Sequence, residues 1–424
     1  MKRSFAAVAA VLLLCATGFF AQVAQPSPQD LQQQIQALQA QMQAMARDYQ
    51  AKLDELQKQL EALKSQQQAS GAPPNQGGVP QYEGTAPPLP ASATGANALA
   101  NPAISLIPDM IASGGNDPYW LGQPNAYMRE VEIAFSAAID PYANAFAALS
   151  LEDGQLNVEE GYAAFPALWG GFSAKLGKFK ADFGKNNQMH SHTWFQADQP
   201  LALREILGEE GFSDTGLSLS HLLPTPWTSD ITVEVTSGRA DLFGGSRSSL
   251  AYLAAWRNYW DLTDNSNLEA QLSLSAGKNA QNGTTKLGNL SVTYRYKPIG
   301  NRRESFIWRT EYLRKDVDFE NVVTPDDPSQ PSYLVEGADR WKGAFSYVDW
   351  QFACGWFLGT RGDWVRHPDG GNDSGGALVL TWFPSEFQKF RLQYARTNYA
   401  GIGMRDAVVF EYGFAIGPHG AHPF

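Results

Sequence analysis

The chain has 424 residues and is acidic, with 32 lysines and arginines against 43 aspartates and glutamates and a formal net charge of −11. A pI near 5.1, without a basic patch that carries interleaved aromatics, excludes nucleic acid as an expected partner. Only two cysteines are present, which excludes a small extracellular scaffold held by disulfides.

The first 24 residues have the pattern of a secretory signal peptide. Lys2 and Arg3 form a positive start, and an apolar run follows over Ala6 to Phe20. This run is too short for a comfortable membrane span, which needs about 20 apolar residues, and no later stretch reaches that length. We therefore expect an exported protein. It is either a soluble periplasmic protein or a β-barrel, in which the apolar residues that face the membrane alternate with inward-facing residues and form no continuous apolar run.

Residues 31–66 predict a coiled-coil helix, followed by a flexible Pro-, Gly- and Ala-rich linker over residues 67–102. The helix carries a heptad seam of ten apolar residues at steps of three or four: Leu31, Ile35, Leu38, Met42, Met45, Tyr49, Leu53, Leu56, Leu60 and Leu63. An apolar stripe of this length needs a partner. We expect self-association, with a trimer as the working interpretation and docking on the chain's own body as the alternative.

From residue 103 to residue 424, short segments alternate apolar and polar residues. In the clearest segment, Leu268, Leu272 and Leu274 share one face, and Glu269 and Gln271 share the other. The alternation and the turn residues between segments give about sixteen candidate strands: 103–114, 127–139, 142–151, 156–166, 171–183, 215–223, 229–237, 249–261, 267–277, 287–297, 304–315, 341–353, 355–366, 375–383, 386–397 and 406–416.

The lengths of the connections between these segments also alternate. Tight turns alternate with a set that includes long polar connections, at 184–214, 238–248, 316–340 and 398–405. Short turns on one side and long loops on the other are typical of an outer-membrane barrel. The predicted fold class is all-β: a transmembrane antiparallel β-barrel of about sixteen strands, with an N-terminal coiled-coil α-helix.

Several stretches resemble porin-like outer-membrane proteins of Gram-negative bacteria that carry an N-terminal periplasmic coiled coil. They are REVEIAFSAAIDPYANAFAALS (129–150), VEEGYAAF (158–165), GKFKADFGKNNQMHSHTW (177–194), DQPL (198–201) and GPHGAHPF (417–424). The resemblance implies the sixteen-strand plan shared by general and phosphate-selective porins. It also implies an outer-membrane location, a homotrimer in contact with lipid and lipopolysaccharide, and passage of small solutes or ions without a cofactor.

The segment 184–214 is long for a compact domain, which favours a functional loop. In classical porins the loop at this position folds into the lumen and narrows the pore, and LALREILGEE (201–210) predicts a short helix within it. The resemblance therefore suggests a constriction loop, with these candidate residues: Lys185, Asn187, His190, His192, Trp194 and Asp198.

His190 and His192 also permit a metal interpretation, because H-x-H on an extended strand places both imidazoles on one face. A zinc site would need a further ligand, for which Asp182, Asp198 or Glu205 are the candidates. Hydrogen bonding within a packed loop is the simpler interpretation, so no metal site is assigned. No enzyme is expected either, because Ser191 points away from both neighbouring histidines and no nucleophile elbow or metalloprotease helix is present.

The inward-facing charges should decide selectivity. The alternation places these residues on the lumen face: Lys175, Glu269, Arg295, Arg309, Glu311, Arg361, Asp363, Lys389, Arg391 and Glu411. The acidic balance favours a weak cation preference in a general pore. Two alternatives stay open: a substrate-specific channel for phosphate or a metal ion such as zinc, and a structural envelope tether that acts through residues 31–66.

Overall fold

The computed structural model describes residues 102–417, apart from 245–248, 282, 302 and 324–332. The expected signal peptide, the coiled coil over 31–66 and residues 67–101 of the linker lie outside the described residues. No helix within the described ranges is long and apolar enough to cross a membrane.

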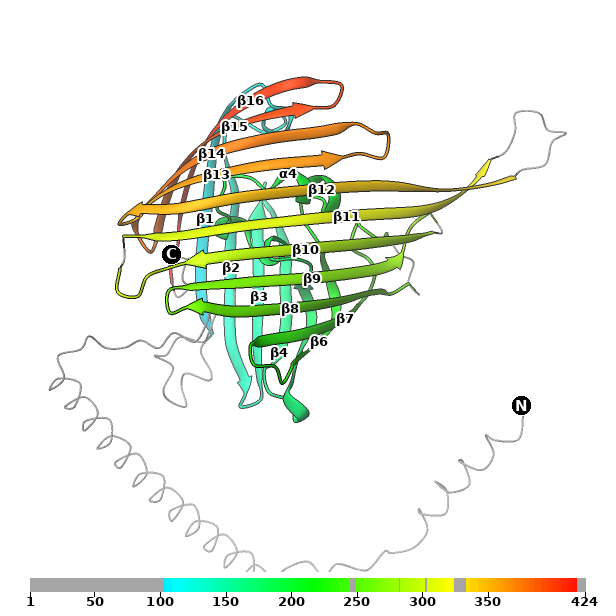
Figure 1. The fold of residues 1–424 in the computed structure, drawn as a ribbon, viewed down its shortest axis with the longest axis horizontal. Helices are drawn as coiled ribbons and strands as arrows, with labels where there is room; N and C mark the ends of the chain where they lie inside the picture. The colour runs from blue at the N-terminus through cyan, green and yellow to red at the C-terminus, as the bar shows by residue number, and fades with distance from the viewer. Residues whose placement is uncertain (1–101, 245–248, 282, 302, 324–332, 418–424) are drawn as a thin grey trace, which may run out of the picture. The chain divides into compact units, whose positions relative to one another are not determined.

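The described part of the chain forms one closed antiparallel barrel of sixteen strands, in which β1 pairs with β16 and every other strand pairs with its neighbours in sequence (Figure 1). The strands are β1 (Ala103–Gly115), β2 (Ala126–Asp140), β3 (Ala143–Glu152), β4 (Gln155–Phe165), β5 (Phe172–Lys180), β6 (Ser213–Leu222), β7 (Thr228–Thr236), β8 (Ala251–Thr263), β9 (Ser266–Lys278), β10 (Thr284–Tyr296), β11 (Ser305–Val323), β12 (Tyr333–Ala353), β13 (Trp356–Arg366), β14 (Asn372–Ser385), β15 (Gln388–Tyr399) and β16 (Gly403–Phe414).

The all-β prediction and the strand count are confirmed, since each of the sixteen predicted segments overlaps one strand. The long connection expected at 316–340 is wrong, because β11 and β12 continue over most of it and pair at Asp316 with Arg340 and at Phe319 with Gly337. Its many acidic residues suggested a loop. However, Val317 and Phe319 alternate with Asp316 and Asp318, which is the period of a strand.

The two ends of the barrel differ in their connections. At one end, here called the turn end, strands are joined by short segments such as 141–142, 264–265 and 354–355. At the other, the loop end, the segments include 116–125 with the short helix α3 (Pro118–Leu121), 181–212 and 237–250 (Figure 1). The observed asymmetry is the one expected of an outer-membrane barrel.

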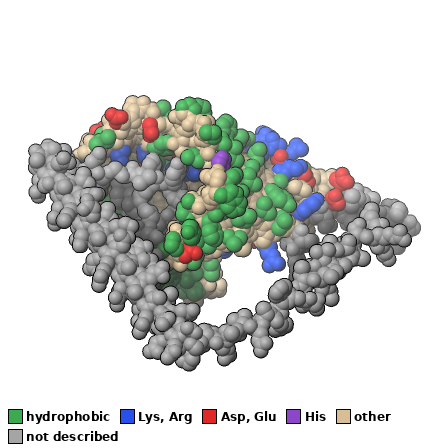
Figure 2. Space-filling model, turned by 90° about the horizontal axis from the view of Figure 1, so that it is seen from below, with side chains coloured by type: hydrophobic (Ala, Val, Ile, Leu, Met, Phe, Trp, Pro, Cys, Tyr) green, Lys and Arg blue, Asp and Glu red, His purple; other side chains and the backbone are tan. Residues whose placement is uncertain are grey.

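The outer surface of the barrel is apolar. Leucine and valine side chains on neighbouring strands are exposed there, among them Leu274, Leu290, Leu358, Leu392 and Val408, and Figure 2 shows hydrophobic side chains gathered on the outside. Aromatic pairs lie at the turn end: Trp227–Trp260, Trp356–Trp382, Trp382–Phe390 and Phe390–Tyr412. An apolar band bordered by aromatic rings matches the lipid-facing surface of a transmembrane barrel.

Candidate functional site

The connection between β5 and β6, residues 181–212, lies inside the barrel and is here called the inner loop. It contains two short 3-10 helices, η2 (Asn186–Gln188) and η3 (Ser191–Thr193), and the helix α4 (Leu201–Leu207). The loop bonds to β2 and β4 on one side and to β9 and β11 on the other, and these strands are far apart in the closed strand order. The inner loop therefore crosses the interior of the barrel.

The first part of the inner loop is held by polar side chains of β9 and β11. Gln271 donates to the Asp182 carboxylate at 2.7 Å, and the Asn186 backbone N–H donates to Glu311 Oε1 at 2.8 Å. Arg309, which is fully buried, donates to Asn186 Oδ1 at 3.0 Å. These buried contacts satisfy polar groups on both partners, as a packed interior requires.

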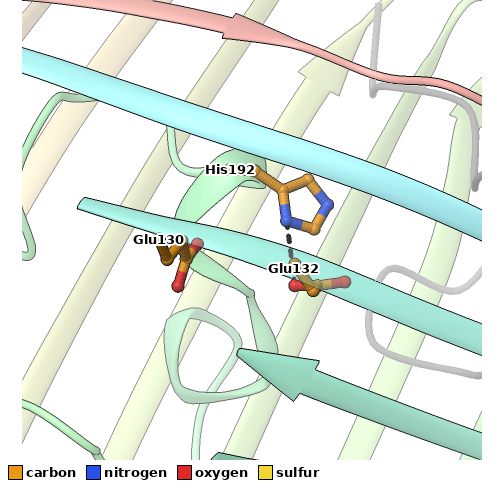
Figure 3. Close-up of side chains that lie close together, drawn as sticks. All are labelled: Glu130, Glu132 and His192. Carbon is orange, nitrogen blue, oxygen red and sulfur yellow. Dashed lines mark ion pairs between the residues drawn. The ribbon is translucent and has the colours of Figure 1, made fainter. Parts of the chain in front are cut away.

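The middle of the inner loop brings two histidines against glutamates of β2 and β4. His190 Nδ1 lies 2.9 Å from Glu159 Oε2 and 3.1 Å from Glu132 Oε2, and His190 Nε2 lies 3.3 Å from Glu160 Oε2. His192 Nδ1 is also 3.1 Å from Glu132 Oε2, and the two imidazole rings stack with centroids 5.9 Å apart. These five residues and Glu130, which neighbours Glu132 on the same face of β2, are here called the His–Glu cluster (Figure 3).

The cluster favours positive charge on the imidazole of the inner loop. Burial by itself would lower the pKa of His190, but the charge of Glu132 and hydrogen bonds to Glu132, Glu159 and Glu160 raise that pKa well above its ordinary value of 6.5. The charged form of the ring is therefore favoured, and it pairs with the carboxylates of the wall.

The last part of the inner loop is bound by the basic residues of β13 and β15. Arg361 makes a two-pronged contact with the Asp198 carboxylate, at 3.0 and 3.1 Å, and its Nε donates to Asp363 at 2.6 Å. Burial raises the pKa of Asp198, but Arg361 outweighs it and the pKa lies below its ordinary value. Arg391 donates to the backbone carbonyls of Trp194 and Gln196, at 2.7 and 2.9 Å.

Helix α4 builds an apolar core inside the barrel near the loop end. Leu203 and Ile206 of α4 are fully buried, as is Phe243 of the next loop. They pack together with inward residues of the wall: Leu253, Leu287, Leu313, Phe345 and Val365. The helix expected over 201–210 is present but ends at Leu207, where Gly208 takes a positive φ of 85° that favours glycine.

The predicted constriction residues all lie in the inner loop. Lys185, Asn187, His192 and Asp198 are buried, and the side chains of His190 and Trp194 are partly exposed. Most predicted pore-lining residues face inward, but they are buried under the inner loop or paired: Arg309, Glu311, Arg361, Asp363, Lys389, Arg391 and Glu411. Lys175, Glu269 and Arg295 are partly exposed. The strong charges of β11, β13 and β15 thus hold the loop in place.

The oxygen ligands expected beside the histidines are wrong. Asp198 pairs with Arg361, Glu205 lies 3.7 Å from Arg204, and Asp182 accepts from Gln271. The carboxylates that do meet the histidines come from β2 and β4, about 30 to 60 positions earlier in the chain. A local H-x-H pattern cannot show this. The alternating Glu130 and Glu132, both on the inward face, were the available signal.

A small cavity remains between the inner loop and the turn-end wall. Its volume is about 20 Å³, enough for one water molecule, and its lining includes Thr193, Trp194, Asp349, Lys389 and Arg391.

Comparisons with known proteins relate the chain to outer-membrane channels through its fold. No protein-family model matches it. An uncharacterized protein of Aquifex aeolicus is 24% identical over 354 residues, which are 73% of each chain. Among solved structures, the anion-selective porin from Comamonas acidovorans has a TM-score of 0.51 at 9% identity, covering 74% of this chain and 99% of that porin. The outer membrane channel DcaP of Acinetobacter baumannii has a TM-score of 0.48 at 10% identity, covering 74% and 96%.

Proposed function

We propose that this chain, which has the closed sixteen-strand plan of outer-membrane porins, is a porin of a Gram-negative outer membrane. It lets small hydrophilic solutes or ions diffuse passively through a pore narrowed by the inner loop. The observation that carries the proposal is the loop itself, tied to opposite walls by buried polar contacts. A segment held in this way reduces the open cross-section without closing the barrel wall.

The charge distribution supports a weak cation preference. Arg361 and Arg391 are engaged by carboxylates and by loop carbonyls, so they do not offer a free basic surface to phosphate. Glu152 near the loop end is partly exposed and adds a carboxylate to the interior. Acidic groups in a low-dielectric passage enrich cations, most strongly at low salt.

The outer surface supports the assembly part of the proposal. The apolar band suits lipid, and lipopolysaccharide is the expected partner at the loop end. A homotrimer would form through the coiled coil and the barrel wall. Solute diffusion needs no catalytic residue, so the proposal includes no enzymatic activity.

The test is single-channel recording with the purified full-length protein in a planar bilayer under a KCl gradient. We expect a steady, small conductance with a reversal potential displaced toward the cation value. Saturable block by phosphate alone would favour an anion-specific channel over the general pore. If the barrel is folded, as judged by its heat-modifiable gel mobility, but shows no conductance, the porin proposal is overturned and the envelope tether becomes the better account.

A further inference from the structure

We propose that the His–Glu cluster binds one divalent transition-metal ion of the zinc class, held by His192 of the inner loop together with Glu130 and Glu132 of β2. Metal binding would be a function separate from solute diffusion, because it does not require the pore to conduct. The bound ion would join the inner loop to the barrel wall at one point.

The donor atoms are already close enough for coordination. One ligand atom from each of Glu130, Glu132 and His192 lies within 4.8 Å of the others (Figure 3). The same distance limit holds for Glu132, Glu159 and His190. Zinc bonds of about 2.0–2.1 Å place tetrahedral ligand atoms roughly 3.4 Å apart. His192 Nδ1 is 3.1 Å from Glu132 Oε2, which is close to that separation, so a small adjustment admits the ion.

Glu130 gives an independent indication of a cation site. Its side chain is 4% exposed, and its Oε1 atom is buried without a hydrogen-bond partner among the described residues. A buried carboxylate oxygen without a donor is unfavourable, and native structures rarely keep one. A metal ion beside Glu132 would satisfy this oxygen.

The charge of the surroundings also favours a dication. The cluster contains four glutamates, and one nearby cation, Lys180, lies beside one of them. Arg129 pairs with Asp109 and Glu411, and Lys180 lies 3.9 Å from Glu159. A divalent ion would bring positive charge to Glu130 and Glu132, with which Lys180 makes no ion pair among the described residues.

The donor set indicates which ion the site prefers. Imidazole nitrogens with carboxylate oxygens suit Zn²⁺ and neighbouring transition metals, whereas Ca²⁺ and Mg²⁺ prefer sites built from oxygen alone. The side chains of His190 and Glu159 are 13% and 15% exposed, which provides an entry path from the interior.

The experiment is titration of the chelator-stripped, full-length protein in detergent with Zn²⁺, followed by isothermal calorimetry and by metal analysis after dialysis. We expect binding of one equivalent of Zn²⁺ and no competition from excess Mg²⁺. Co²⁺ in place of Zn²⁺ should give the intense visible bands of tetrahedral nitrogen and oxygen coordination.

Variants decide whether this cluster is the site. His192→Ala and Glu130→Gln should each weaken Zn²⁺ binding at least tenfold. Glu130→Gln tests the site even if His192→Ala folds poorly, because Glu130 Oε1 has no hydrogen bond to lose within the described part of the chain. His367→Ala is the matched control, since His367 pairs with Asp373 elsewhere at the loop end. No stoichiometric binding, or equal binding by wild type and both cluster variants, would overturn the proposal.

Discussion

The contact between Arg361 and Asp198 should hold the last part of the inner loop against the wall, so Arg361→Gln is the most informative change. The guanidinium side chain is 4% exposed, and it bonds both oxygens of Asp198, the Asp198 carbonyl and Asp363. Removing it leaves two buried carboxylates, Asp198 and Asp363, without their cation.

The expected energy follows from this geometry. Breaking a buried ion pair by deleting one partner costs about 3–5 kcal/mol, because the remaining charge stays desolvated. At about 1.4 kcal/mol per factor of ten, the ratio of docked to undocked loop falls roughly a hundredfold to a few thousandfold. The apolar core around Leu203 and Ile206 still holds α4, so the segment that opens is the part before that helix, residues 194–199.

Two measurements check this expectation. Single-channel conductance should rise and become noisier in Arg361→Gln, and proteinase K should cut the folded barrel within 194–199. Lys286→Gln is the control, because Lys286 and Asp318 form an exposed pair worth about 0–1 kcal/mol. Adding Asp198→Asn should recover part of the lost anchoring, since the two effects are coupled. Unchanged conductance, noise and cleavage in Arg361→Gln would refute the reasoning.

Three further predictions concern the core, the wall and pH. Ile206→Ala should cost about 2–5 kcal/mol by opening a cavity in the buried core, visible as a lower urea midpoint, whereas the exposed Leu262→Ala should leave the midpoint almost unchanged. Gly177→Ala should abolish the heat-modifiable folded band, because φ is +139° and the new Cβ would lie 2.2 Å from the Gly161 carbonyl; normal folding would contradict the register. The pKa of Asp198 in the folded protein lies below its ordinary value of 3.8. The carboxylate therefore stabilises the docked loop fully above pH 3.8, and this stabilisation is lost as the pH falls through the lower pKa of the folded state. Channel noise should therefore stay constant from pH 7 to about 5 and increase only in stronger acid, a rise that Asp198→Asn should not show.

The barrel could be predicted from the sequence because alternation is a local signal. The alternation of apolar Leu272 with polar Ser273 assigns the two residues to opposite faces of a strand. Sixteen alternating segments of this kind predict the strand count. The boundary error at β11 and β12 has the same origin, since the acidic residues at 316–320 outweighed the alternation of Val317 and Phe319.

The interior could be predicted only in part. The loop's identity came from a resemblance, but its partners are side chains on strands far away in the sequence. Glu132 meets His192 across 60 positions, and Gln393 meets Ala197 across 196. The apolar inward residues Leu313 and Val365 were also missed, because an alternating strand does not by itself show that a loop will cover its inner face.

The anchoring of the inner loop at both sides of the closed barrel has a kinetic consequence. Arg361, Arg391 and Gln393 belong to β13 and β15, which follow residues 194–198 by more than 150 positions, so the binding surface for this segment does not exist until these strands have joined the sheet. Contacts with such large sequence separation form late, because chain ordering must precede them. We therefore expect a slow final phase in refolding, in which the inner loop docks inside a barrel whose strands have already paired. Protease resistance of the loop should then appear later than strand formation.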